Sequence, residues 1–272
     1  SENFISYIKP FFCYEKNKID KNDFLLVGSN AILENRVMSA NFISNKKKVI
    51  SFNHANYNTL IINEPHQEYT EHAFCDYYVD YGSIKMKKKE LKSDYLKPKK
   101  IIRFSSSRFE KTTLKENISD NKVIYIPDSF NGDKRQGPYR EMDDEKYYNF
   151  QNRLNLSNKN IFIKRHPKGA KLKEIITKKR IKIFAEKNIK EDLSKIFNKH
   201  SLFIVDRISQ AFFEIARGGS KILYFNIGRR KIRKDVINEI KKRAFVVNID
   251  PYTISSAKIS SYIKKAKNFK PK

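Results

Sequence analysis

The second half of the chain alternates strand and helix patterns, which predicts an α/β fold with a parallel sheet. Short apolar runs such as Leu202–Val205 are typical of strands buried on both faces. Between them, apolar residues recur three and four positions apart, as in Tyr147, Phe150 and Leu154, which is typical of helices. Gly218 and Gly219 follow one of these helices as a termination signal. We expect strands at residues 122–127, 161–164, 181–185, 202–205, 221–225 and 245–247, and helices at residues 143–156, 170–179, 191–199, 210–217, 231–243 and 254–267.

The first half shows a weaker version of the same pattern. Strands are expected at residues 24–27, 48–52 and 77–81, and helices at residues 31–38 and 68–74. Residues 85–100 form a lysine-dense connector, and Ile101–Phe104 is either a strand or the approach to a second domain. The 272 residues suffice for two domains. We expect two Rossmann-like domains, residues 1–115, which are short or truncated for such a domain, and residues 116–272.

The net charge and the cysteine content limit which binding partners and which cellular compartment are expected. The net charge is +27, which suits nucleic acid or an anionic membrane surface. Lysine, asparagine and isoleucine are abundant throughout, however, so we expect no specific nucleic-acid site and only an electrostatic attraction to anionic lipids. No run of 18 apolar residues and no signal-peptide pattern occurs in the sequence. Cys13 and Cys75 have no metal or redox spacing, which favours a cytoplasmic protein with reduced thiols.

A group of basic residues ends the strand expected at residues 161–164. Lys164, Arg165 and His166 precede Pro167, which biases His166 towards an extended backbone at the sheet edge. Ligands of open α/β sheets bind beyond the carboxyl ends of the strands. A phosphate there would receive charge-assisted hydrogen bonds. The alternative is a solvated basic loop.

A second polar group follows the strand at residues 202–205. Ser209 begins a helix, where it can cap the backbone and face an anion, and Glu214 follows five residues on. A carboxylate at this edge can accept hydrogen bonds from ribose hydroxyls. Asp206 and Arg207 are further candidates. The alternative is an ordinary N-cap with a solvated glutamate. Together the two strand ends favour a nucleotide ligand, and a nucleotide-sugar transferase is the leading hypothesis.

Histidines and carboxylates gather in the first half of the chain. His54 follows an expected strand, and Glu64, His66 and Glu68 come shortly after it. A histidine at a strand end can remove a proton from an acceptor hydroxyl. Metal binding by His54, His66 and Glu68 is a weaker alternative, because their spacing fits no known zinc pattern. A histidine-rich surface loop is a third.

The order of these motifs resembles that of bacterial surface-carbohydrate transferases of GT-B fold. The matching elements are His54, Glu64-x-His66, Asp76-Tyr77 with Tyr81-Gly82, Lys164-x-His166-Pro167, and Ser209 with Glu214, over roughly residues 50 to 250. The group includes capsule and O-antigen transferases, the Kdo and sialic-acid transferases that use CMP-sugars, and the CDP-glycerol glycerophosphotransferases. Ala55 stands where several of them have glycine, and Tyr81 where several have tryptophan.

The resemblance implies that the His-Pro and Ser elements hold the donor phosphate and that the glutamate holds the ribose. We therefore expect a glycosyltransferase of cell-envelope polysaccharide or lipopolysaccharide synthesis, peripheral to the membrane. It would use a nucleotide-sugar, first of all a CMP-linked one, and a glycan or lipid-linked acceptor. Because cationic groups can neutralise the leaving phosphate, no metal and no bound cofactor are expected. The alternatives are a CDP-glycerol-type glycerophosphotransferase, a basic nucleic-acid-binding protein, and a non-catalytic protein, which Ala55 keeps open.

Overall fold

The computed structural model divides the chain into two compact units, residues 1–107 and 108–272. The parts of the chain that it describes are residues 24–30, 32–53, 60–61, 71–81, 98–104, 120–128, 144–165, 189–197, 200–229 and 231–271. Each unit contains a parallel sheet, so the α/β class with two such sheets is confirmed. The expected boundary near residue 115 falls within residues 105–119, outside the described residues.

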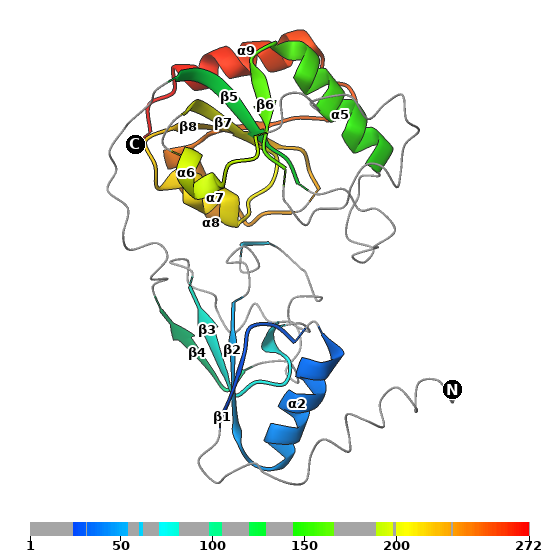
Figure 1. The fold of residues 1–272 in the computed structure, drawn as a ribbon, viewed down its shortest axis with the longest axis vertical. Coiled ribbons are helices and arrows are strands. Elements are labelled where there is room, and N and C mark those ends of the chain that lie inside the picture. The colour runs from blue at the N-terminus through cyan, green and yellow to red at the C-terminus, as the bar shows by residue number, and fades with distance from the viewer. Residues whose placement is uncertain are drawn as a thin grey trace. The chain divides into compact units, whose positions relative to one another are not determined.

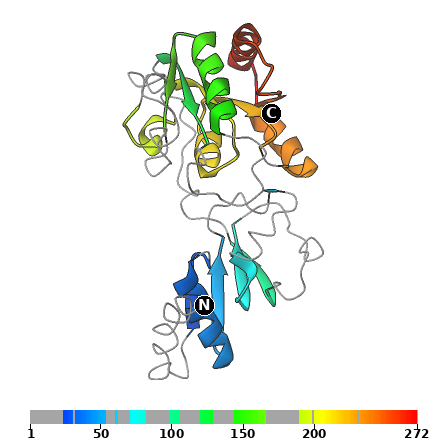
Figure 2. The same cartoon turned by 90° about the vertical axis from the view of Figure 1, so that its right-hand side faces the viewer.

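The first unit is a four-stranded parallel sheet with the order β1-β2-β3-β4. Its elements are β1 (Phe24–Val27), α2 (Leu33–Ser44), β2 (Lys48–Phe52), β3 (Tyr77–Asp80) and β4 (Lys100–Arg103). Figures 1 and 2 show α2 beside one face of this sheet. On that face Val27, Val49, Cys75 and Tyr78 form a buried cluster, against which Phe42 of α2 packs.

The second unit is a five-stranded parallel sheet with the order β6-β5-β7-β8-β9. Its strands are β5 (Asp120–Ile126), β6 (Ile161–Ile163), β7 (His200–Val205), β8 (Lys221–Asn226) and β9 (Phe245–Asn248). Its helices are α5 (Asp144–Ser157), α6 (Leu193–Ile196), α7 (Gln210–Ala216), α8 (Lys234–Arg243) and α9 (Ser256–Lys267). Because the chain leaves β5 first towards β6 and then returns past it to β7, the direction of winding reverses between β5 and β7.

Helices cover both faces of this second sheet, as parallel strands require. Figure 1 shows α5 and α9 on one face and α6, α7 and α8 on the other. Phe150 and Leu154 of α5 and Ile259 and Ile263 of α9 belong to one buried core cluster with the strands. The Ser255 hydroxyl accepts a hydrogen bond from the Lys258 N–H at 3.2 Å and caps α9. No helix among the described residues is long and apolar enough to span a membrane.

Most expected elements are present, with shifted ends. The helix expected at residues 31–38 continues to Ser44, and the one expected at residues 191–199 occupies only Leu193–Ile196. Residues 101–103 of the segment expected at 101–104 belong to a strand, β4, because they pair with β3. The helix expected at residues 170–179 and the strand expected at residues 181–185 lie outside the described residues.

Candidate functional site

The carboxyl ends of β5 and β7 form the switch point of the second sheet. The two strands pair in parallel, and their ends carry Asp128 on one side and Asp206 with Arg207 on the other. In sheets of this strand order, ligands bind beyond the carboxyl ends of the two strands between which the winding reverses.

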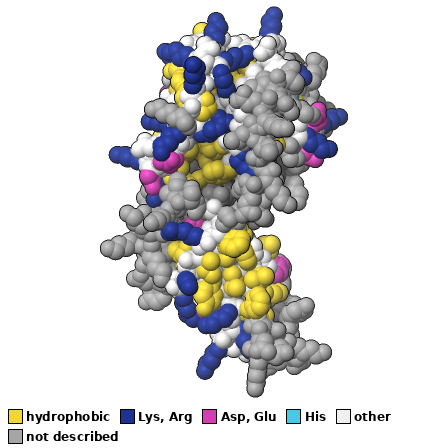
Figure 3. Space-filling model, turned by 90° about the vertical axis from the view of Figure 1, so that its left-hand side faces the viewer, with side chains coloured by type: hydrophobic (Ala, Val, Ile, Leu, Met, Phe, Trp, Pro, Cys, Tyr) yellow, Lys and Arg dark blue, Asp and Glu magenta, His cyan; other side chains and the backbone are white. Residues whose placement is uncertain are grey.

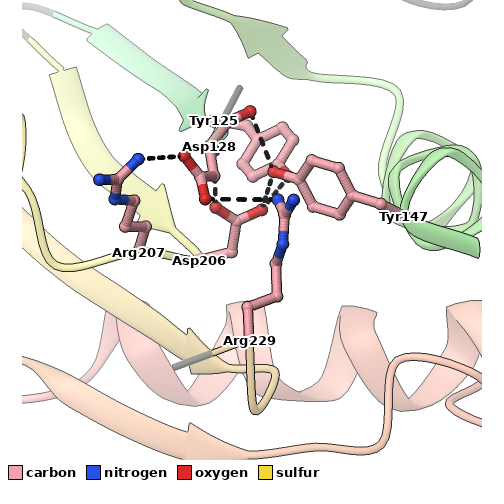
Figure 4. A network of polar contacts seen from close by, with 6 residues as sticks. All are labelled: Tyr125, Asp128, Tyr147, Asp206, Arg207 and Arg229. Atoms are coloured by element: carbon pink, nitrogen blue, oxygen red, sulfur yellow. Dashed lines mark hydrogen bonds and ion pairs between the residues drawn. The ribbon is translucent and has the colours of Figure 1, made fainter. Parts of the chain in front are cut away.

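Asp206 is the centre of a buried hydrogen-bond network (Figure 4). The Tyr147 hydroxyl donates to Asp206 Oδ2 at 2.5 Å, and the Tyr125 hydroxyl donates to the same oxygen. The backbone N–H of Asp128 donates to Asp206 Oδ1 at 2.9 Å. Burial raises the pKa of Asp206 above its ordinary value, and the two tyrosine hydroxyls oppose that rise. The Asp206 carboxylate therefore fixes the ends of β5, β7 and α5 relative to one another.

Asp128 joins two arginines to this network. Arg207 Nη1 lies 2.5 Å from Asp128 Oδ1, and Arg229 Nη1 lies 3.3 Å from Asp128 Oδ2. The Asp128 and Arg229 side chains are almost completely buried, whereas that of Arg207 is 20% exposed. A buried ion pair of this kind fixes geometry more than it adds stability. Of the two arginines, Arg207 is the one that a ligand can reach.

A glycine turn brings Arg229 into the network from β8. Gly228 has a φ of 76°, a left-handed conformation that favours glycine. The Arg229 guanidinium carbon then lies 4.3 Å from the centre of the Tyr147 ring, a cation–π contact. Figure 4 shows Arg207 and Arg229 on either side of the two aspartates. Residues from β5, α5, β7 and β8 thus meet at one edge of the sheet.

Lys164 and Arg165 follow β6 at the same edge. The Lys164 N–H donates to the Tyr125 carbonyl oxygen at 2.8 Å, which places the two residues beside the end of β5. Burial lowers the pKa of the Arg165 guanidinium, and the hydroxyls of Tyr125 and Tyr147 act against this effect. Within the described residues, neither side chain has a hydrogen-bond or ion-pair partner. Arg165 is therefore a half-buried cation beside the network, and no carboxylate of the described residues forms an ion pair with it.

Ser209 and Glu214 lie beyond the end of β7. Ser209 directly precedes α7, and Glu214 lies within it. Ser209 occupies the N-cap position with an extended backbone, but its hydroxyl makes no capping hydrogen bond, so the expected cap was wrong. Gln210 Nε2 donates to Glu214 Oε1 at 3.3 Å, which holds the carboxylate along its own helix. Because β5 separates β6 from β7, strand spacing puts the Lys164–Arg165 pair about 10 Å from the end of β7.

The remaining predicted site residues lie outside the described residues. They are His54, Glu64, His66, Glu68 and His166. The residue before His54 is described: the Asn53 N–H donates to the Val79 carbonyl oxygen at 2.9 Å, and Asn53 Nδ2 donates to Asp80 Oδ1 at 3.1 Å. Asn53, the last described residue before His54, therefore lies at the carboxyl edge of the first sheet. Among the described residues, no group of three or more histidine, cysteine, aspartate or glutamate residues could hold a metal ion.

Four residues of the network were not predicted from the sequence as site residues: Tyr125, Asp128, Tyr147 and Arg229. Tyr125 and Tyr147 have the spacing of core positions, and both are fully buried. Two signals were available for the charged residues. Asp128 follows a strand end directly after Pro127, and Arg229 follows the glycine at the end of β8. Such positions are where an α/β sheet places its ligand-binding groups.

Comparisons with known proteins give remote structural similarities. No protein family and no curated protein matches the sequence. The chain is similar to the pneumococcal O-GlcNAc transferase GtfA, solved with UDP and GlcNAc, with a TM-score of 0.49 and 10% identity, covering 97% of this chain and 52% of that one. It is also similar to the spinosyn forosaminyltransferase SpnP, with a TM-score of 0.46 and 7% identity, covering 98% and 70%. The chain thus spans about half the length of GtfA.

Proposed function

We propose that this chain is a glycosyltransferase of GT-B type and that its second unit binds the nucleotide part of a nucleotide-sugar donor. The observation that carries this proposal is Arg165, a half-buried cation without a partner among the described residues, beside the switch point between β5 and β7. Arginine matches the geometry of phosphate oxygens and remains charged at this degree of burial. A phosphate is the ligand that best satisfies such a group.

The buried network supports the proposal by its charge. Asp128 neutralises Arg207 and Arg229 in part, and Asp206 lies beside them, so these four residues are close to balanced. Among the described residues at this edge, Lys164 and Arg165 then remain as charges without an ion-pair partner. A buried network of nearly balanced charge with two cations beside it suits an anionic group that binds without rearranging the protein. We propose that His166, Ser209 and Glu214 complete the site, with Glu214 on the ribose.

The proposed reaction needs one base and one anion site. A base, first of all His54 and otherwise Glu64, His66 or Glu68, removes a proton from an acceptor hydroxyl, whose oxygen forms the new bond to the anomeric carbon of the donor sugar. The bond between that carbon and the donor phosphate breaks, and the negative charge that develops on the leaving phosphate is neutralised by Arg165 and Lys164. This route uses the chain's own cations to stabilise the leaving group.

A transfer assay tests the function. CMP-, UDP- and GDP-sugars and CDP-glycerol are offered with a lipid-linked or glycan acceptor, and release of the nucleotide is measured. We expect turnover with a nucleotide-sugar, first of all a CMP-linked one, and its loss in Arg165→Ala. Turnover with CDP-glycerol alone would make the protein a glycerophosphotransferase that uses the same site. Nucleotide binding without any turnover would favour the non-catalytic alternative.

Contact with an anionic membrane is part of the proposal, and α9 supports it. All charged residues after Asp250 are lysines, and Lys258, Lys264 and Lys265 are exposed on α9. Each lysine near an anionic bilayer surface contributes about 1 kcal/mol to binding. We expect the protein to sediment with phosphatidylglycerol vesicles at low salt and not with phosphatidylcholine vesicles. Replacing Lys264 and Lys265 by glutamine should weaken this association.

A further inference from the structure

The amino edge of the second sheet lies opposite the edge that carries the proposed donor site. It consists of the residues that begin β5 to β9 and the last turns of α5, α8 and α9, because these helices run back along the strands. Two contacts place the helix ends there. Lys221, at the start of β8, donates to the carbonyl oxygen of Lys267, the last residue of α9. Arg243, the last residue of α8, donates at 2.8 Å to the carbonyl oxygen of Ser220, which directly precedes β8.

The described part of this amino edge is strongly basic. Asp120 is the one carboxylate among its described residues, and it pairs with His200 at 2.8 Å and with Lys122 at 3.2 Å. Glu239, one turn before the end of α8, pairs with Lys242 at 2.7 Å. Figure 3 shows many Lys and Arg side chains and few acidic ones on one side of the second unit. The lysines of the edge come from the strands and from helices on both faces of the sheet: Lys122, Lys221, Lys241, Lys242, Lys264 and Lys265.

The basic character of the amino edge exceeds what the general abundance of lysine explains. At the carboxyl edge of the same sheet, acidic residues accompany the basic ones, after the strands and in the first turns of α5 and α8: Asp128, Asp144, Glu145, Asp206, Asp235 and Asp250. A lysine content that is high throughout the chain does not produce this difference between two edges. The helix dipole favours cations at helix C-termini, but it does not account for Lys122 and Lys221, which belong to strands.

An exposed apolar side chain lies at the same edge. Leu156, in the last turn of α5, is 68% exposed. The Val123 N–H donates to the Asn160 carbonyl oxygen at 3.3 Å, which places the end of α5 beside the start of β5. Lysines attract anionic headgroups as point charges, and a leucine among them can enter the bilayer interface. Nucleic-acid sites favour arginine for bidentate phosphate contacts, whereas Arg243 at this edge donates to backbone carbonyl oxygens. The composition of the edge therefore favours a membrane over nucleic acid.

We propose that the amino edge of the second sheet, with Lys122, Leu156, Lys241, Lys264 and Lys265, is the surface of this chain that binds an anionic membrane. This inference rests on the membrane contact of the proposed function and names the side of the second unit that makes it. The donor site at the carboxyl edge then lies away from the bilayer by at least the length of β7, which is six residues or about 20 Å. A lipid-linked acceptor has to extend that far from the membrane, which favours one that already carries a glycan.

Tryptophan fluorescence in the full chain tests this orientation. The sequence contains no tryptophan, so Leu156→Trp introduces a single reporter at the amino edge. Tyr252→Trp is the matched control, at a position that is 45% exposed beyond the carboxyl end of β9. Both variants are titrated with phosphatidylglycerol vesicles that contain brominated lipid, and binding is followed in parallel by sedimentation. We expect the emission from position 156 to shift to the blue and to be quenched, and the emission from position 252 to stay unchanged.

The outcomes separate the edge from the membrane contact as such. Sedimentation with the vesicles but no quenching at position 156, or equal quenching at both positions, would overturn the proposed edge and leave the membrane contact in place. No sedimentation would overturn both and leave the glycosyltransferase proposal to its transfer assay. A response of position 156 to a DNA duplex and not to vesicles would assign the edge to nucleic acid and overturn the proposal.

Two substitutions on α8 provide a second test. Lys241→Gln removes a charge from the last turn of this helix, at the amino edge, and Lys234→Gln removes one from its first residue; both lysines are exposed. Lys234 lies about 10 Å further from the amino edge along the helix, roughly one Debye length at 0.1 M salt. Lys241→Gln should therefore weaken binding to phosphatidylglycerol vesicles about fivefold, and Lys234→Gln should weaken it much less. Equal effects of the two substitutions would show that binding follows total charge, and would overturn the proposal.

Discussion

Replacing Tyr147 by phenylalanine removes its short hydrogen bond to Asp206, together with longer contacts of 3.3 Å to the Tyr125 hydroxyl and to the Asp128 carbonyl oxygen. The change removes one hydroxyl that donates to a buried carboxylate at 2.5 Å, while the ring that contacts Arg229 remains. A hydrogen bond to a charged group contributes about 1.5–3 kcal/mol, and no cavity forms in the core. We therefore expect the second unit to lose about 2 kcal/mol of unfolding free energy in Tyr147→Phe.

Tyr224→Phe is the matched control. Tyr224 is equally buried in the same unit, but its hydroxyl donates to the uncharged Asn226 Oδ1 at 3.4 Å. The expected loss is at the low end of the range for neutral hydrogen bonds, about 0.5 kcal/mol. The free energy of unfolding in urea is measured by hydrogen exchange of peptides from β5 and β7, so that it reports on the second unit separately from the first. Equal losses in the two variants, at an unchanged dependence on urea, would refute the role of Asp206 as the centre of the network.

Three further predictions concern the histidines. His166→Ala should weaken nucleotide binding by about 1.5–3 kcal/mol with the fold intact, measured by calorimetry and circular dichroism; unchanged affinity would remove His166 from the site. His54→Ala should lower turnover about 10²–10⁴-fold. The donor affinity should not change, because the nucleotide is bound by the second unit. Unchanged turnover would mean that His54 is not the base, and Glu64, His66 and Glu68 would be the next candidates. Burial lowers the pKa of His72 from 6.5 to about 4. The unfolded chain therefore takes up the proton first, and the first unit should lose roughly 3 kcal/mol of stability as the pH falls from 6.5 to 4, a loss absent in His72→Phe.

The sequence predicts the second sheet well because its strands are buried on both faces. Leu202–Val205 and Ile222–Phe225 are uninterrupted apolar runs, and all of these residues are buried. For segments with fewer contacts, the ends and the type of the element were harder to predict from the sequence. α6 is shorter than its pattern, and β4 could be identified as a strand only through its pairing with β3.

Candidate residues were predictable where the local sequence marks a strand end, and not where the partner is distant. Lys164, Arg165 and Asp206 each follow an apolar run, so their place at the carboxyl edge follows from the pattern. Tyr125 has the pattern of a core residue in a strand. Its role depends on Asp206, which lies 81 positions further along the chain. No local pattern contains that pairing; it arises because β5 and β7 are neighbours in the sheet.

Nucleotide binding by Arg165→Ala tests the central claim most directly. Titration calorimetry of the full chain with CMP, CDP, UDP and GDP is compared with that of Arg165→Ala and of Lys122→Ala, which removes a cation near the opposite, amino edge of the same sheet. We predict that the wild type binds nucleotides and that a cytidine nucleotide binds most tightly. The affinity should fall by about 10- to 100-fold in Arg165→Ala and should not change in Lys122→Ala. No binding of any nucleotide, or equal affinity in all three proteins, would contradict the assignment of the switch point as the donor site.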